Sequence, residues 1–464
     1  MNRQQLAGRQ MTLNEYEQLI GQLSEAEHQW LSQQQQVDAV IRIKGTLRCQ
    51  RCNNQQHFET IHPSVHYCTH CIQLGRLTTK DTLYRFSNTL MPELEMSQST
   101  YLSWRGTLSN EQQRVSSMLV EHVSDVTKDD IVVAVTGAGK TEMIFEVINH
   151  VLLKKGRVAV ASPRVDVCLE LAPRLQQAFS EVDMIALHGK MDEDFRYTPF
   201  VVSTIHQLWK FYHAFDLIIV DEVDAFPLAN DEGLHFAVQQ ALKPNGKKIY
   251  LTATPDQFLQ NKIKAKQAEV AILPARFHGY PLPEPKFCWV GDWKEQIQQH
   301  KKGKLWQFLK KFLNVEGVKL VFMPSIEMAD LLYQWIQEEG IDIKLAVVHS
   351  QDAQRIEKVQ QLRNGELDAL ITTTILERGV TFKNCQVVIV GAEDAKYSDA
   401  ALIQMSGRVG RNPQFPTGVL VYAHFGISRK MVLARRNIRS MNKEARKRGL
   451  LVNEPTLSKM PTNV

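Results

Sequence analysis

The sequence contains no long hydrophobic run. No apolar stretch in its 464 residues approaches the length of about 20 residues that a membrane-spanning helix needs. The chain also opens on the polar residues Met1 to Gln5, and not on a basic segment followed by an apolar one. We therefore expect a cytosolic protein that does not cross a membrane.

Cysteine is scarce, and four of the seven cysteines form two Cys-x2-Cys pairs that are separated by fifteen residues. In a tetrahedral Zn²⁺ site, each such pair binds one edge of the metal. We predict a structural zinc site formed by Cys49, Cys52, Cys68 and Cys71. Thiolate ligands also imply a reducing compartment.

A disulfide framework is the alternative reading of these cysteines. It is less favoured because Cys168, Cys288 and Cys385 are isolated in the sequence, and we expect them to be packed thiols. Four thiolates complete a structural zinc site without further ligands. The histidines nearby are therefore expected to be surface residues: His57, His62, His66 and His70.

Net charge is small, at +5, but it is unevenly distributed. Arg429 to Arg448 holds nine Lys or Arg residues against the single acid Glu444, so this segment carries +8 and the remainder −3. We predict a basic helix that binds a phosphate backbone. A solvated basic helix or a site for an acidic protein partner are the alternatives.

A glycine-rich segment, residues 134–141, directly follows the apolar run 131–133. A strand that ends in such a turn and opens a helix directs backbone N–H groups at one point, as a triphosphate requires. Lys140 is predicted to bind the β- and γ-phosphates, and the Thr141 hydroxyl to bind Mg²⁺. The predicted nucleotide-binding residues of this loop are Thr136, Gly137, Ala138, Gly139, Lys140 and Thr141, with Ala134 where the usual pattern begins with glycine.

An apolar run at 217–220 ends in the acidic sequence Asp221-Glu222-Val223-Asp224. This is typical of a buried parallel strand that carries acids to the carboxyl edge of a sheet, although a solvated strand end gives the same pattern. Asp221 is predicted to bind Mg²⁺, and Glu222 to orient or deprotonate the attacking water. A further strand, 248–251, precedes Thr252-Ala253-Thr254.

Two arginines, Arg408 and Arg411, lie three residues apart in the sequence Gln-Met-Ser-Gly-Arg-Val-Gly-Arg. On a helix they would share a face. Guanidinium groups suit a phosphoryl transition state because they are planar, charged and bidentate. We predict that both arginines are catalytic.

In this order, the phosphate loop, Asp-Glu-x-Asp, Thr-Ala-Thr and Gln-x-x-Gly-Arg-x-Gly-Arg resemble the motor core of superfamily-two helicases and translocases, from about Gly106 to about Gly426. The N-terminal cysteines and the sequence that extends from Asp221 to Pro227 make the chain similar to the ComFA family of late-competence DNA-uptake ATPases. The primosomal helicase PriA differs, because its zinc cysteines interrupt the second motor domain.

The resemblance implies further site residues. Ser109 and Gln112 resemble the glutamine motif that reads adenine, and Gly379 lies in the sequence that resembles motif five. The strand contacts that the resemblance implies are Arg164, Ser203, Thr204 and Thr373. Trp104 and Trp209 either stack on an adenine or a nucleic-acid base or, as we expect, belong to the packed interior.

We expect an α/β protein with two tandem RecA-like parallel-sheet motor domains, preceded by a small zinc module with four cysteine ligands and by a helical arm. Apolar residues at helical spacing predict the arm, and prolines between 274 and 285 predict a linker. Apolar runs at 320–322, 346–348, 369–371 and 387–390 are expected to be the core strands of the second motor domain. The expected ranges are 1–44 for the arm, 45–80 for the zinc module, 81–105 for a connector, 106–282 for the first motor domain, 283–303 for the linker, 304–440 for the second motor domain and 441–464 for the basic tail.

The resemblance implies an ATP-, Mg²⁺- and Zn²⁺-dependent ATPase that pulls single-stranded DNA through a membrane channel during natural transformation. Such a protein would lie on the cytoplasmic face of the membrane, with channel and competence proteins as partners, and a homo-oligomer is one of the assemblies open to it. A replication-restart or RNA helicase is one alternative. An ATP-gated scaffold, whose zinc module and basic tail recruit partners, is another.

Overall fold

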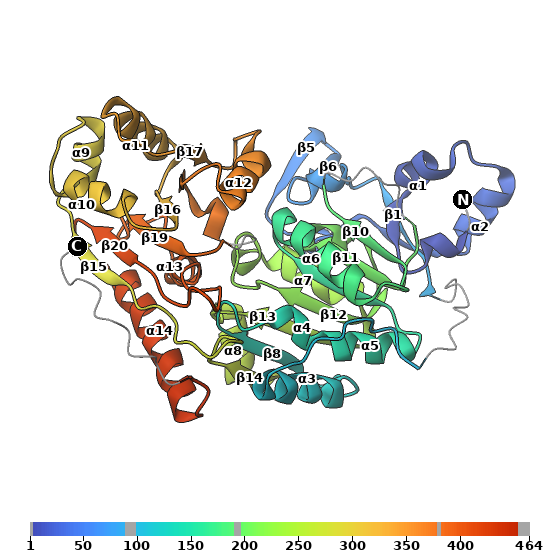
Figure 1. Ribbon diagram of the computed structural model, residues 1–464. Helices are drawn as coiled ribbons and strands as arrows, with labels where there is room; N and C mark the ends of the chain where they lie inside the picture. Colours follow the sequence, from blue (N-terminus) through green and yellow to red (C-terminus); the bar gives the residue numbers. More distant parts are fainter. Residues whose placement is uncertain (1–2, 89–98, 190–195, 378–381, 453–464) are drawn as a thin grey trace. The chain divides into compact units, whose positions relative to one another are not determined.

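The structure is a computed structural model that describes residues 3–88, 99–189, 196–377 and 382–452 (Figure 1). Its internal contacts divide the chain into two compact units. The first unit comprises Met1–Val133 and Lys140–Ala271, and the second comprises Ala134–Gly139 and Ile272–Val464. Each unit is built around its own parallel sheet.

The sheet of the first unit has seven strands in the order β10-β11-β9-β12-β13-β8-β14. Every strand pair from β10 to β8 is parallel, and the apolar runs are buried on both faces, as the sequence predicted. The strands are β8 (Asp129–Ala134), β9 (Val158–Ser162), β10 (Met184–Leu187), β11 (Phe200–Thr204), β12 (Phe215–Asp221), β13 (Leu242–Thr252) and β14 (Ala268–Leu273).

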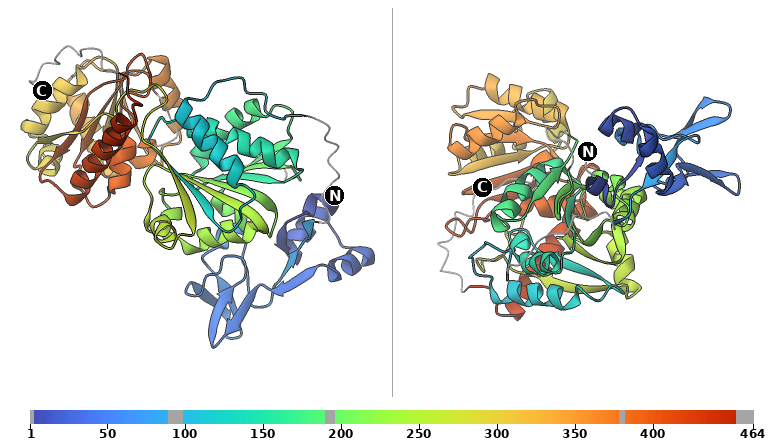
Figure 2. Two further views of the ribbon diagram at one scale, coloured as in Figure 1. Left: turned by 90° about the horizontal axis from the view of Figure 1, so that it is seen from below. Right: turned by 90° about the vertical axis from the view of Figure 1, so that its right-hand side faces the viewer.

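Helices cover both faces of this sheet (Figure 2). Their N-termini are capped by the short polar side chains that free backbone N–H groups need, such as Ser109 before α3, Asp231 before α7 and Asp256 before α8. The helices are α3 (Asn110–His122), α4 (Lys140–Met143), α5 (Phe145–Leu153), α6 (Val165–Ala178), α7 (Glu232–Ala241) and α8 (Gln257–Lys264), with the 3-10 turns η4 (Ile205–Lys210) and η5 (Leu228–Asn230).

The N-terminal residues of the first unit form a small α+β region and two hairpins. The predicted helical segment contains helices α1 (Leu13–Ile20) and α2 (Glu25–Ser32), but it also supplies two strands of a three-stranded antiparallel sheet, β1-β7-β2. These strands were missed because β1 has three residues and β2 is mostly polar. The strands are β1 (Gln10–Thr12), β2 (Gln35–Asp38), β3 (Val40–Ile43), β4 (Thr46–Cys49), β5 (Phe58–His62), β6 (Val65–Cys68) and β7 (Thr82–Arg85).

The sheet of the second unit has six parallel strands in the order β15-β20-β19-β16-β18-β17. Four of them lie where the sequence predicts strands, whereas β15 and β20 were not predicted. The strands are β15 (Lys286–Trp289), β16 (Val318–Phe322), β17 (Leu345–Val348), β18 (Ala369–Thr372), β19 (Cys385–Val390) and β20 (Leu420–His424). The helices are α9 (Trp293–Gln298), α10 (Lys304–Leu313), α11 (Ile326–Glu338), α12 (Arg355–Asn364), α13 (Asp399–Ser406) and α14 (Arg429–Lys447).

The predicted linker and the described part of the predicted tail, residues 441–452, therefore contain regular elements. Residues 283–303 include β15, which pairs with β20, and α9. The predicted basic helix is confirmed as α14, which continues through the expected boundary at residue 440. Asn442 on its buried face accepts a hydrogen bond from Leu282 N at 2.8 Å and donates one to Leu282 O at 2.9 Å, so this helix holds the proline-rich segment.

Within the described residues, no helix combines the length and the apolar character that crossing a membrane requires.

Candidate nucleotide-binding and zinc sites

The glycine-rich loop connects the buried strand β8 to helix α4. Gly137 and Gly139 have φ values of +81° and +73°, which residues with a Cβ rarely adopt, so both positions favour glycine. Ile144, which is in the αR conformation, is the one residue between α4 and α5. The loop therefore opens a nearly continuous helix at Lys140, with the Thr141 side chain buried.

The acids of the first unit follow β12 at the carboxyl edge of the sheet. The Lys140 Nζ atom lies 3.9 Å from Asp221 Oδ1, and these side chains are only 18% and 12% exposed. The structure thus brings the predicted phosphate-binding lysine together with the predicted Mg²⁺ ligand. Glu222 has a φ of +58°, and its backbone N donates to Asp221 Oδ1 at 2.9 Å. A non-glycine residue in this region is strained, which is a common feature of functional sites.

Asp224 joins the acidic loop to the end of β13. Its two carboxylate oxygens accept hydrogen bonds from Thr252 Oγ1 at 2.9 Å and from Thr254 Oγ1 at 3.0 Å. Sequence reasoning identified Thr252-Ala253-Thr254 but not its partner, because the two segments are 28 and 30 residues apart in the chain. This contact couples the predicted Mg²⁺ loop to the neighbouring strand.

Gln112 occupies the third position of α3 and is buried. Its Oε1 accepts a hydrogen bond from Ser109 N at 2.8 Å, and its own N donates to Ser109 Oγ at 3.4 Å, so the two residues form a capping box. The pattern Ser-x-x-Gln that resembles the adenine-reading motif thus also has a structural role.

The predicted strand contacts differ in exposure. Arg164 follows β9 and precedes α6, and it is half-buried. Ser203 and Thr204 end the neighbouring strand β11 and are buried, so Arg164 offers more accessible surface than either. Thr373 follows β18 in the second unit and is half-buried. Gly379 lies outside the described residues.

The two arginines lie beyond the end of a helix, which corrects the expectation that they share a helical face. Helix α13 ends at Ser406, and the chain turns through Gly407. Arg408 is buried at 1% exposure, whereas Arg411 is half-buried and its Nε donates to Gly407 O at 3.0 Å. The two guanidinium groups therefore have different environments, and Arg411 is the more accessible.

Arg276 supports this turn from the same unit and was not singled out from the sequence. Its guanidinium donates to Gly410 O and, at 3.3 Å, to Gly407 O. Burial, with the charge of Arg411, lowers the pKa of Arg276 to about 9. An arginine in a proline-rich segment carries no sequence signal for this role, because its partners are backbone carbonyls 131 and 134 residues away. Residues 407–411 are named here the arginine turn.

The four paired cysteines form one buried cluster, and the disulfide alternative is wrong, since all seven cysteines are free. Three Sγ–Sγ distances are 3.6 Å between Cys52 and Cys68 and 3.8 Å from Cys71 to Cys49 and to Cys68. Four sulfurs at about 2.3 Å from a common Zn²⁺ would lie about 3.8 Å apart. The sulfur geometry fits a tetrahedral metal.

Arg51 reinforces this cluster. Its Nε and Nη2 atoms each lie 3.3 Å from Cys71 Sγ, and Nη2 also donates to Cys71 O at 2.9 Å. Hydrogen bonds from the Cys49 and Cys52 thiols, together with the Arg51 charge, lower the pKa of the Cys71 thiol. These contacts favour the thiolate that a metal binds and hold the second cysteine pair in place.

One of the nearby histidines is more than a surface residue. His70 Nε2 lies 3.1 Å from Asp231 Oδ1, which also caps α7, and this contact raises the pKa of His70. Gln240 of the same helix donates to Gln50 O at 3.0 Å. The cysteine cluster is thus attached to α7.

Trp209 is buried, and its Nε1 donates to Gly233 O at 2.9 Å, which confirms the packing interpretation of this residue.

Three protein-family models match the chain. They are described as "Competence protein ComFA N-terminal domain" at residues 2–85, "Type III restriction enzyme, res subunit" at residues 105–257 and "Helicase conserved C-terminal domain" at residues 303–413. The chain therefore carries superfamily-two helicase and ATPase domains behind a ComFA-type N-terminal domain.

Known proteins agree with this assignment. Competence protein ComFA of Bacillus subtilis is 41% identical over 87% of both chains, and that of Streptococcus pneumoniae is 41% identical over 94% of this chain and 98% of its own. Among solved structures, Mycobacterium smegmatis helicase Lhr bound to ssDNA and AMP-PNP shares the fold over 73% of this chain and 48% of its own, with a TM-score of 0.53 and 16% identity. The chain belongs to the ComFA family.

Proposed function

We propose that this protein is an ATP-dependent, single-stranded-DNA-stimulated translocase that drives the uptake of transforming DNA across the cytoplasmic membrane in natural competence. The observation that carries the proposal is the meeting of Lys140 and Asp221 at the carboxyl edge of the seven-stranded sheet. A lysine for phosphate and a carboxylate for Mg²⁺ at one point are what nucleoside triphosphate hydrolysis requires.

In the proposed mechanism, residues 136–141 bind the triphosphate through backbone N–H groups, Lys140 and the Thr141 hydroxyl. Asp221 and Thr141 would hold a Mg²⁺ ion, and Glu222 orients or deprotonates the attacking water. When bound there, the ion would supply positive charge next to the phosphate oxygens. Asp224, Thr252 and Thr254 keep the acidic loop in place through the two hydrogen bonds described above.

The arginine turn is proposed to supply the positive charge that stabilises the transition state, with Arg411 as the group that contacts the transferred phosphoryl. Its greater accessibility than Arg408 supports this assignment. Because a guanidinium gains most when charge builds on the equatorial oxygens, this contribution belongs mainly to turnover and not to binding.

The substrate assignment has two supports of different kind. The family name, shared with relatives at 41% identity, indicates a role in competence. The superfamily resemblance implies strand contacts at Arg164, Ser203 and Thr204 in the first unit and at Thr373 in the second, and we propose these contacts for this chain. The cysteine cluster is proposed to bind one structural Zn²⁺ ion.

A comparison of nucleic acids tests this function. ATP turnover of the full chain is measured with single-stranded DNA, duplex DNA and RNA in parallel. We expect single-stranded DNA to give the largest acceleration. Preferential stimulation by duplex DNA or RNA would favour a replication-restart or RNA helicase, and equal turnover in all samples would favour an ATP-gated scaffold.

A further inference from the structure

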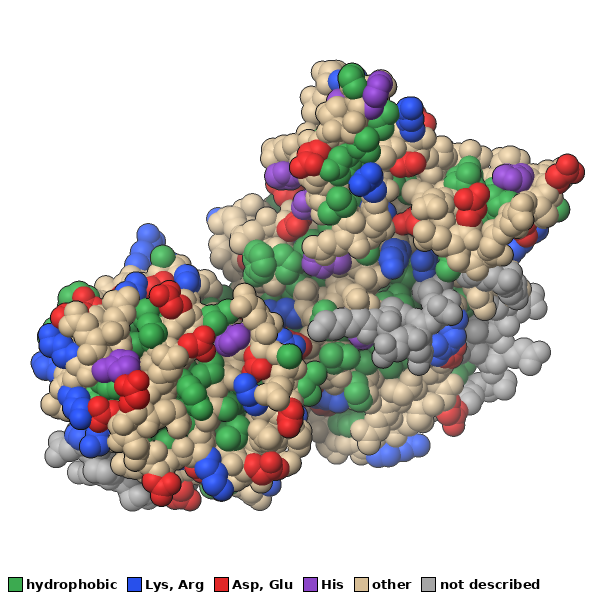
Figure 3. All heavy atoms as spheres, turned by 90° about the horizontal axis from the view of Figure 1, so that it is seen from above, with side chains coloured by type: hydrophobic (Ala, Val, Ile, Leu, Met, Phe, Trp, Pro, Cys, Tyr) green, Lys and Arg blue, Asp and Glu red, His purple; other side chains and the backbone are tan. Residues whose placement is uncertain are grey.

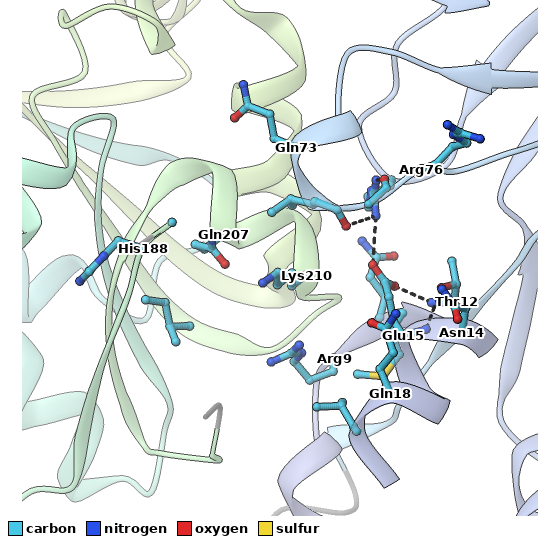
Figure 4. A pocket seen from close by; sticks show the side chains of 18 residues that line it. Arg9, Thr12, Asn14, Glu15, Gln18, Gln73, Arg76, His188, Gln207 and Lys210 are labelled. Atoms are coloured by element: carbon cyan, nitrogen blue, oxygen red, sulfur yellow. Dashed lines mark hydrogen bonds and ion pairs between the residues drawn. The ribbon is translucent and has the colours of Figure 1, made fainter. Parts of the chain in front are cut away.

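A groove of about 670 Å³ lies within the first unit, between the N-terminal region and the edge of the seven-stranded sheet (Figure 4). Side chains from β1, α1 and the segment after the second cysteine pair form one wall, and residues after β10 and on η4 form the other. Figure 4 shows Arg9, Gln18, Arg76 and Lys210 around the same space. It is named here the Lys210 groove.

The Lys210 groove is strongly basic. Among the described residues that line it, four are Lys or Arg, namely Arg9, Arg51, Arg76 and Lys210, and one, Glu15, is acidic. Glu15 already accepts a hydrogen bond from Thr12 N at 2.7 Å and lies 3.4 Å from Arg51. Elsewhere, on the face drawn in Figure 3, basic and acidic side chains are interspersed. The described lining of the groove therefore carries an excess of positive charge.

Lys210 is a partly buried cation of the groove. It is half-buried, and its Nζ has no hydrogen-bond or ion-pair partner among the residues that the structure describes. Burial, with the charges of Arg9 and Arg51, lowers the pKa of Lys210 to about 8. An anion in the groove would stabilise the charged form of Lys210, because it would pair with an ammonium group that is partly removed from water.

The groove continues a row of proposed strand contacts. Thr204 of β11 is in register with Ser162 of β9, and Ser203 is in register with Leu187 of the edge strand β10. Parallel strands lie about 4.8 Å apart, so Arg164 after β9, Thr204 and His188 after β10 follow one another along the carboxyl edge. His188 lines the groove, and η4, which begins directly after Thr204, ends at Lys210.

We propose that the Lys210 groove binds the phosphate backbone of single-stranded DNA where the strand passes beyond the edge of the first sheet. The proposal rests on the proposed function, since it extends the strand path that Arg164 and Thr204 begin. A volume of about 670 Å³ lies in the range of compact ligand sites, about 300–1,000 Å³, and accommodates part of one strand but not a duplex. Exposed amides such as Gln18 and Gln73 add hydrogen bonds to sugars and bases.

The test measures the affinity of the full chain for a fluorescent oligodeoxythymidine of about 25 nucleotides, longer than a typical single-domain site of about 4–16. Lys210→Met removes the charge and keeps the length of the side chain. Gln18→Glu and Gln18→Lys place opposite charges at an exposed position on the groove. Gln29→Glu, at an exposed position of α2 that does not line the groove, is the matched control.

Lys210→Met is expected to weaken binding about threefold or more and to reduce the slope of log affinity against log salt by about 0.7. Gln18→Glu weakens binding, Gln18→Lys strengthens it, and Gln29→Glu leaves it unchanged. The Gln18 pair carries the test if Lys210→Met fails to fold. Equal affinities in all four variants would overturn the groove as a DNA site and assign it to an acidic protein partner. Absence of binding by the wild type would overturn the proposed function itself.

Discussion

The carboxyl edge of the first sheet and the arginine turn of the second unit hold their charged groups in different ways. At the carboxyl edge of the first sheet, charged side chains contact one another or neighbouring hydroxyls. Lys140 lies next to Asp221, and Asp224 accepts a hydrogen bond from Thr252. At the second, guanidinium groups donate to backbone carbonyls, as in Arg276 to Gly407 and Arg411 to Gly407. The first region is thus held by contacts among charged and hydroxyl side chains, and the second by hydrogen bonds that fix the shape of a turn.

This difference suggests a division of roles between binding and chemistry. Substitutions in the first region should disturb nucleotide and Mg²⁺ binding, because they change groups that contact the ground state. Substitutions at the arginine turn should leave binding intact and slow turnover. Five predictions test this division and its boundaries.

The largest effect is expected from Lys140→Ala. The lysine contacts phosphates already in the ground state, so ATP affinity falls and turnover is abolished to within detection. Fluorescent-nucleotide titration and steady-state hydrolysis measure the two quantities. A variant that binds ATP as the wild type does would remove Lys140 from the ground-state contacts and end the contrast with Arg411.

Arg411→Ala is expected to lower kcat by about 10³-fold or more while ATP and DNA affinities persist, by analogy with other arginine fingers. Arg363→Ala, at an exposed position of α12 in the same unit, is the control and should leave kcat unchanged. If Arg411 only formed a surface ion pair, its loss would cost under about 1 kcal/mol of stability and turnover would stay within a few-fold of the wild type.

Arg276→Lys sharpens the comparison because Arg276 positions the turn without being a proposed contact of the nucleotide. Lysine keeps the charge but cannot make both carbonyl hydrogen bonds, so the turn is held less well. We expect kcat to fall by about tenfold, less than for Arg411→Ala, with ATP affinity unchanged. A lower ATP affinity, or a loss as large as that of Arg411→Ala, would contradict a positioning role.

Removal of zinc is expected to unfold the region around the cysteine cluster and to leave the carboxyl edge of the first sheet and the arginine turn intact. Four thiolates bind Zn²⁺ with an apparent free energy of about 10–16 kcal/mol at neutral pH, so the cluster should contain one zinc per chain and the surrounding hairpins should unfold without it. Cys52→Ser should lose the metal and keep ATP binding. The contacts described above join the cluster to helix α7 through His70 and Gln50, and helix α7 is not part of the phosphate loop. Elemental analysis that finds well under one zinc per wild-type chain would contradict the site.

The smallest effect is expected from substitutions in α14, which should change the salt dependence of DNA affinity. Its buried face consists of Met431, Ala434, Ile438, Asn442 and Ala445, which leaves Arg436 and Lys443 exposed and about two helical turns apart. Their joint replacement by alanine should reduce the salt slope of DNA affinity by about 1.4, at about 0.7 per phosphate contact.

The control for α14 is the double replacement of Lys310 and Lys311, which are exposed at the end of α10. That variant should keep the wild-type slope. Equal slopes in both double variants would assign α14 to a protein partner instead of DNA.

The sequence predicted those parts of the molecule whose signal is local. Buried runs such as 217–220 and 387–390 became central strands, since a parallel strand that is buried on both faces consists of continuous apolar residues. The cysteine spacing predicted a cluster because two short loops bring four sulfurs together. In each case the residues that interact are close together in the chain or follow a fixed period.

What could not be predicted depends on contacts between distant residues. Strand β15, with the sequence Lys-Phe-Cys-Trp, is too short and mixed to be recognised, and it is ordered because it pairs with the remote strand β20. Arg276 and Asp231 gained their roles in the same way, through partners in remote segments. The different exposure of Arg408 and Arg411 also arises only from where α13 ends.

We propose that ATP hydrolysis moves this protein along single-stranded DNA. The most direct measurement follows ATP hydrolysis and the release of streptavidin from a biotin at either end of the oligonucleotide in the same sample. We expect ATP-dependent release of streptavidin from one end only, and we expect Arg411→Ala to lose this release although it still binds ATP and DNA. Rapid DNA-stimulated hydrolysis by the wild type without release from either end would contradict it.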